Sequence, residues 1–331
     1  MWIIDIYKKW NSTSIVPHTT HIVGKDILEE LMHSELPISK RPIDASCMTL
    51  LGPPERTGLS PSLTTLMQDV IDAQEIHYHN FSKDTGTDLT KGEFMASWID
   101  NLADPSAKND LVAVTQVGFT PKGLGGCHFL LPDKSCVGGD WTSTLTSPGC
   151  ITHPHVDYYG SRQYLVHFKG QKLWLLWPPT ERNLSWYRER HIANMDHHRT
   201  LLAIRELEGL QLCLFSGDEE AFVLQPHVIH ACISLSVCGH SGIPTCQLSH
   251  YDESVPFMKW GVDWIKSGPT RGLSPIDIHD ECELFLEEMK WWKRIKTPKE
   301  REEKEKHRQM LKEVGLVEGS IKQMVCDLED N

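Results

Sequence analysis

The sequence predicts a mainly β protein with α-helical additions, in which a double-stranded β-helix (jelly-roll) core lies between N-terminal helices and a helical C-terminal region. Short apolar runs separated by glycine turns extend over residues 111–236, a pattern typical of closed antiparallel folds. Residues 91–103 and 274–292 instead carry apolar side chains at helical spacing. The stretch KEREEKEKHRQMLKE near the C-terminus mixes charges of both signs, as solvated helices do.

Composition limits the function classes. The chain has 331 residues, 40% of them hydrophobic, which is enough for a large core, and its net charge is −12. An acidic chain is a poor nonspecific binder of the DNA backbone and would tolerate a basic peptide partner. The ten cysteines form no C-x-x-C pair, so we expect reduced thiols in an intracellular protein. We expect neither a signal peptide in MWIIDIYKKW nor a membrane span.

Turn and helix signals divide the chain into three expected parts. Residues 1–60 read as an irregular extension, 61–262 as a catalytic domain with its leading helices, and 263–331 as a helical region. Apolar spacing predicts a helix over 63–71, and Thr90-x-x-Glu93 reads as the capping box of a helix over 91–103.

Further elements follow from the same signals. Ser274-Pro275 indicates another helix start, with a serine N-cap followed by a proline at the first helical position. Residues 141–148 read as a loop over the mouth of a cavity. The polar insert 181–207 is expected to form a helical lid or a substrate surface.

Three residues form a candidate metal site. His155 and Asp157 are two apart, so in a strand they point to the same face. His230 lies in a second β pattern, between apolar neighbours. Two imidazoles and one carboxylate with open positions opposite form the facial triad of non-haem Fe(II) oxygenases. We interpret His155, Asp157 and His230 as the metal ligands.

Several neighbours compete with these assignments. His227 follows a proline in an expected turn, and we favour His230 over it. His153 has a histidine, not a carboxylate, two residues on, so we place it behind the ligands or at the surface. His167 is most simply a core histidine, and Cys232, Cys238 and Cys246 are buried thiols rather than zinc ligands.

Two segments carry a resemblance to a known family. THPHVDYYGSRQYLVHFKGQKLWLLWPPT and SGDEEAFVLQPHVIHACISLS resemble the two metal-binding regions of JmjC proteins, the Fe(II)- and 2-oxoglutarate-dependent oxygenases of the cupin superfamily. The resemblance covers roughly residues 110–250. It implies a cupin barrel in which His155, Asp157 and His230 bind Fe(II) and are catalytic.

The same resemblance implies the cosubstrate site. Lys172 would pair with the distal carboxylate of 2-oxoglutarate, and the hydroxyl of Thr152 would share it. A buried dicarboxylate needs a cation and a further donor, which these residue types supply. Three protein ligands leave metal positions for the keto acid and for O2.

The spacing from His155 to Lys172 resembles that of the lysine-demethylase branch. It implies oxidation of a protein side chain, including N-methyl hydroxylation of a histone lysine tail, and favours the nucleus as location. The alternatives are a JmjC protein hydroxylase and a catalytically silent JmjC-like scaffold that binds a partner. No reader module with zinc-ligand spacing is visible in the sequence.

Overall fold

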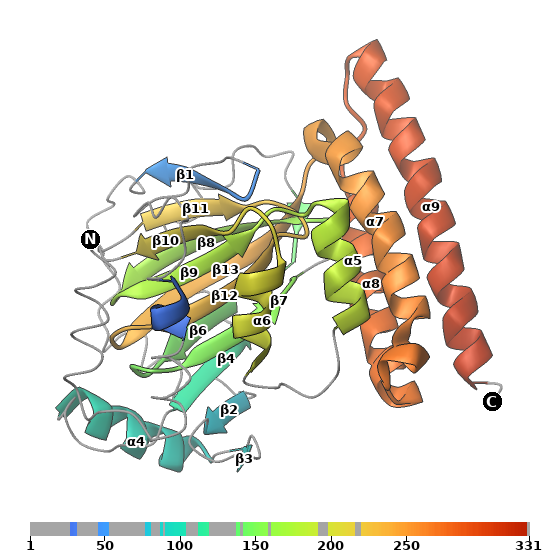
Figure 1. Cartoon of the computed structure of the whole chain (residues 1–331). Coiled ribbons are helices and arrows are strands. Elements are labelled where there is room, and N and C mark those ends of the chain that lie inside the picture. Colours follow the sequence, from blue (N-terminus) through green and yellow to red (C-terminus); the bar gives the residue numbers. More distant parts are fainter. Residues whose placement is uncertain are drawn as a thin grey trace.

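A computed structural model describes residues 27–31, 46–52, 77–80, 87–88, 90–103, 112–118, 137–139, 142–157, 160–190, 198–215 and 220–329. Two antiparallel sheets form its centre, and helices cover one side (Figure 1). The strands of the larger sheet are β1 (Met48–Gly52), β2 (His77–Asn80), β3 (Thr87–Asp88), β4 (Val112–Gly118), β5 (Val137–Gly138), β6 (Thr142–Thr146), β8 (Arg162–Lys169), β11 (Glu220–Leu224) and β13 (Cys238–Cys246). The smaller sheet contains β7 (Ile151–His155), β9 (Lys172–Trp177), β10 (Gln211–Phe215) and β12 (Ile229–Ser234).

The strand pairing confirms the predicted double-stranded β-helix. β9 pairs with β10, β8 with β11, β7 with β12 and β6 with β13, so the chain from β6 to β13 is one long hairpin rolled up on itself. Because the hairpin is rolled up, successive strand pairs lie in opposite sheets. The larger sheet contains the order β11-β8-β13-β6, and the smaller sheet has the order β10-β9-β12-β7. This is the jelly-roll arrangement, and it brings β7 and β12 side by side.

The smaller sheet is buried on both faces. In β9, Leu173, Leu175 and Trp177 belong to a core shared with the helices, whereas Trp174 and Leu176 belong to the core inside the barrel. Side chains two apart share a face, so Lys172 points to the barrel side with Trp174. A sheet buried on both faces explains why KLWLLW is apolar after its first residue.

Helices pack outside this barrel. They include α4 (Lys91–Ala103), α5 (Glu181–Arg190), α6 (His198–Glu206), α7 (Tyr251–Lys266), α8 (Pro275–Lys293) and α9 (Arg301–Glu329), with short 3₁₀ turns η3 (Leu248–His250) and η4 (Gly268–Arg271). α7, α8 and α9 pack together on one side of the barrel, with α9 outermost (Figure 1). No helix among the described residues is long and apolar enough to cross a membrane.

Both predicted helix starts are confirmed. At α4, the Thr90 hydroxyl accepts from the Glu93 amide at 3.3 Å, while the Glu93 carboxylate accepts from the Thr90 amide at 2.8 Å. At α8, Ser274 and Asp277 form the same reciprocal box, with Pro275 in the first turn. Each box satisfies two amides that the first helical turn leaves unpaired.

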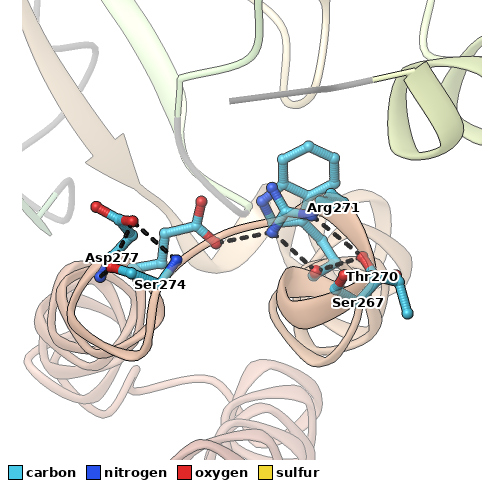
Figure 2. A network of polar contacts seen from close by, with 7 residues as sticks. Ser267, Thr270, Arg271, Ser274 and Asp277 are labelled. Carbon is cyan, nitrogen blue, oxygen red and sulfur yellow. Dashed lines mark hydrogen bonds and ion pairs between the residues drawn. The ribbon is translucent and has the colours of Figure 1, made fainter. Parts of the chain in front are cut away.

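A buried arginine fixes the connection between α7 and α8 (Figure 2). The Arg271 guanidinium lies 3.6 Å from the Trp264 ring centroid and donates to the Trp264 carbonyl at 3.1 Å. It also donates to the Glu281 carboxylate at 3.1 Å and to the Ser267 hydroxyl at 3.3 Å. One side chain therefore ties the end of α7 to the first half of α8.

The structure corrects some of the expectations drawn from the sequence, and one expectation falls on residues that it does not describe. The predicted loop over 141–148 is wrong for its central part, because Thr142–Thr146 is strand β6, paired with β13 and β4. Its threonines are β-branched and favour a strand over the loop suggested by nearby glycine and proline. The insert 181–207 contains α5 and α6, as the helical reading expected. The predicted helix over 63–71 lies outside the described residues, and α7 runs across the expected boundary at 262.

Candidate metal centre

The structure brings His155, Asp157 and His230 together. His155 and His230 face each other across the β7–β12 pair, with ring centroids 4.1 Å apart. Asp157 follows β7, and its carboxylate oxygens lie 3.5 Å from His155 Nε2 and 3.7 Å from His230 Nε2. One ligand atom from each residue lies within 4.8 Å of the others, which is close enough to surround a single ion.

Both histidines are oriented by their own strands. His155 Nδ1 donates to the His153 carbonyl at 2.8 Å, and His230 Nδ1 donates to the Val228 carbonyl at 3.0 Å. A carbonyl can only accept, so in each neutral ring the proton is on Nδ1 and Nε2 carries a lone pair. Metal-binding histidines are commonly held through the other ring nitrogen in this way.

The side chains of His155, Asp157 and His230 provide donor atoms that suit a cation. Burial is the main cause that lowers the pKa of His230 to about 4, and the neighbouring His155 is the second. The His230 ring is therefore neutral near pH 7. Burial raises the pKa of Asp157, but His230 and His155 outweigh it and bring that pKa to about 2. Near pH 7 the His230 ring nitrogen and the Asp157 carboxylate can therefore both act as metal ligands, beside His155. The residues fit a divalent metal of the facial-triad class.

An irregular register brings Thr152 to the same side of the sheet. Between the pairs His230–His155 and Cys232–Thr152, β12 advances two residues and β7 advances three. The extra residue is a β-bulge, and directly paired residues share a face. Thr152 is therefore on the same side of the sheet as His155 and His230, and it is exposed on the end strand of the smaller sheet.

Lys172 forms a second centre of charge inside the barrel. The residue is only 2% exposed, and its ammonium lies 3.3 Å from His240 Nδ1 and 5.6 Å from the Trp174 ring centroid. Among the described residues, no carboxylate lies within ion-pair distance of it. A buried ammonium with one neutral acceptor lacks compensation, so the surroundings of Lys172 suit an anion.

The groups around Lys172 are neutral. Burial raises the pKa of Cys150 to about 11 and that of Cys232 to about 12, so both are thiols near neutral pH. The hydroxyls of Thr146 and Ser234 lie 2.7 Å apart, and Ser234 is paired with Lys172 across the sheet. Within the described residues, the ammonium of Lys172 is thus a single positive charge among hydrogen-bonding groups.

Trp174 connects the two centres. Its ring stacks on the His230 ring at 5.5 Å and lies near the ammonium of Lys172. Its indole nitrogen is buried and has no hydrogen-bond partner among the described residues.

The competing histidines have other positions. His227 has a left-handed backbone (φ 56°), and its ring lies between Phe257 and Trp260 of α7, at centroid distances of 4.9 and 4.8 Å. His167 donates through Nε2 to the Gly170 carbonyl at 2.9 Å and is fully buried, in keeping with a core histidine.

His153 lies behind the ligands. Its ring Nδ1 forms a hydrogen bond with the Thr200 hydroxyl of α6 at 3.1 Å, and its backbone carbonyl accepts the hydrogen bond that orients His155. Helix α6 is thereby linked to the candidate ligand His155 through one residue. Sequence reasoning did not single out Thr200, Trp174 or His240, because each acts through a contact with a distant strand or helix that no local pattern reveals.

Comparisons with known proteins add little to this geometry. No family model matches the sequence, and no curated protein matches it. Two similar solved structures are described as the X-ray structure of E. coli ycfD (13% identity, TM-score 0.38, 84% of this chain and 67% of that one) and the structure of YcfD, a ribosomal oxygenase from Escherichia coli (12% identity, TM-score 0.38, 69% and 53%). The chain spans about half the length of the second structure, and these values are too low to transfer a function.

Proposed function

We propose that this protein is an Fe(II)- and 2-oxoglutarate-dependent oxygenase of the JmjC type that acts on a protein side chain. The observation that supports this best is the pairing of two sites in one barrel. His155, Asp157 and His230 offer three ligands to one ion, and the unneutralised ammonium of Lys172 lies beyond Trp174 on the same face. A molecule that chelates a metal at one end and ends in a carboxylate fits both.

The bound iron and keto acid would supply the redox chemistry, in which O2 gives one oxygen atom to a substrate C–H bond and one to succinate, with release of CO2. The protein's residues would do the rest. His155, Asp157 and His230 would hold the ion. Lys172 and Thr152 would bind the distal carboxylate, and the Trp174 N–H, which has no partner among the described residues, would be a further donor. The apolar barrel interior excludes water.

The substrate class rests on the sequence. The resemblance to JmjC lysine demethylases supports an N-methylated lysine, where hydroxylation of the methyl group gives a product that breaks down to formaldehyde and the amine. The net charge of −12 suits a basic peptide such as a histone tail, and such a substrate would place the protein in the nucleus. Hydroxylation of an unmethylated side chain is the second candidate, because the same site would perform it.

A catalytically silent scaffold is disfavoured because the structure keeps all three ligand residues and the buried lysine. The test is conversion of 2-oxoglutarate to succinate by the iron-loaded protein. Turnover should require Fe(II) and should vanish in Asp157→Ala, and equal turnover in that variant would refute the metal assignment. Mass spectrometry of methylated and unmethylated histone peptides after incubation separates demethylation, seen as loss of a methyl group, from hydroxylation, seen as gain of an oxygen atom.

A further inference from the structure

His240 contacts the buried ammonium of Lys172, and the proposed function gives it no role. It lies on β13 of the larger sheet, whereas Lys172 lies on β9 of the smaller one. Its Nδ1 is 3.3 Å from the ammonium, and its ring meets Trp174 edge-on at 5.8 Å. The contact therefore spans the barrel, between side chains 68 residues apart in the sequence.

The hydrogen bond between Lys172 and His240 has only one possible donor and acceptor. An ammonium can only donate, so His240 Nδ1 accepts and the ring carries its proton on Nε2. The ring is neutral, since burial and the adjacent Lys172 lower the pKa of His240 well below 6.5. Lys172 keeps two further N–H groups for an incoming anion.

A lysine ammonium moves on a flexible four-carbon stem, and fixing it in place favours ligand binding. In the described residues, His240 is the one hydrogen-bond acceptor that holds this ammonium. We propose that His240 is a positioning residue that holds Lys172 in place for a second carboxylate, so that the protein prefers keto acids with two carboxylates. This inference rests on the proposed function, because it assumes a keto acid in the barrel.

The test compares two keto acids on the Mn(II)-loaded protein by calorimetry. One is 2-oxoglutarate, and the other is 2-oxobutyrate, which lacks the second carboxylate. In His240→Phe, the Kd for 2-oxoglutarate should rise roughly tenfold. This is the change in Kd that corresponds to the free energy of one hydrogen bond to a charged group. The Kd for 2-oxobutyrate should stay within about twofold, because that ligand does not reach the ammonium.

Matched variants separate positioning from general damage. His240→Asn keeps an acceptor and should recover most of the loss. His250→Phe changes another histidine, just beyond β13, that contacts Arg162 instead of Lys172, and should bind like the wild type. His240→Leu replaces His240→Phe if the larger ring lowers the unfolding temperature.

The outcomes are distinct. An unchanged Kd for 2-oxoglutarate in His240→Phe, or an equal rise for both keto acids, overturns the role of His240 and leaves the proposed function standing. Failure of the wild type to bind 2-oxoglutarate overturns the proposed function and this inference with it.

Discussion

Replacing Lys172 by methionine should stabilise the ligand-free protein. The ammonium is buried inside the barrel, where the described residues offer it one neutral acceptor and no carboxylate. Methionine has a similar length and no charge, so Lys172→Met removes a buried charge that no described carboxylate compensates. Replacing buried ionic groups by apolar ones of similar volume gains about 1–4 kcal/mol in known cases. We expect about 1–3 kcal/mol, because His240 loses its donor.

The same change should weaken the binding of 2-oxoglutarate. Loss of charge-assisted hydrogen bonds worth about 1.5–3 kcal/mol corresponds to a Kd roughly 10- to 150-fold higher. Opposite effects on stability and binding distinguish a lysine retained for a ligand from a lysine retained for the fold.

Chemical denaturation of the metal-free protein measures the first effect, and calorimetry with Mn(II) and 2-oxoglutarate measures the second. Lys259→Met is the matched control, because Lys259 pairs with Glu313 at the surface at 3.1 Å and its loss should change stability by less than about 0.5 kcal/mol. If Lys172→Met destabilises the free protein by more than about 1 kcal/mol, Lys172 supports the fold and the anion-site reasoning is wrong.

Other predictions concern the fold. Arg271→Met should lower stability by about 3 kcal/mol, because it leaves a half-buried carboxylate without its partner; urea denaturation would show this, and a loss under about 1 kcal/mol would contradict it. Ser274→Ala should lower the Tm by roughly 2 °C at pH 7. Hydrogen bonds from Ser274 lower the pKa of Asp277 below its usual 3.8, so the bond from the Ser274 hydroxyl to this carboxylate adds stability above pH 3.8 that is lost as acid protonates the carboxylate. The Tm difference between the two proteins should therefore narrow at low pH, where only the bond from the Asp277 amide to the hydroxyl remains. Iodoacetamide at pH 7.5, followed by peptide mapping, should label the exposed Cys326 and spare the buried Cys232, and rapid labelling of Cys232 would show an open barrel.

The sequence predicts the jelly-roll core and a candidate ligand set, because both leave short-range signals. Alternation and glycine turns mark the strands, and the i, i+2 spacing of His155 and Asp157 puts two ligands on one face. The structure does bring these two residues together with His230.

Other features depend on register and long-range packing. Simple alternation puts Thr152 and His155 on opposite faces, and only the bulge between β7 and β12 reverses this. The contact of His240 with Lys172 depends on how the two sheets close, and the threonine-rich β6 looked like a loop because its neighbours are turn formers.

Calorimetric titration of the metal-free protein, first with Mn(II) and then with 2-oxoglutarate, tests the central claim most directly. We predict one strong metal site per chain, lost in Asp157→Ala, and binding of one 2-oxoglutarate only after the metal is bound. Unchanged metal binding in Asp157→Ala, or 2-oxoglutarate binding that does not depend on the metal, would contradict it.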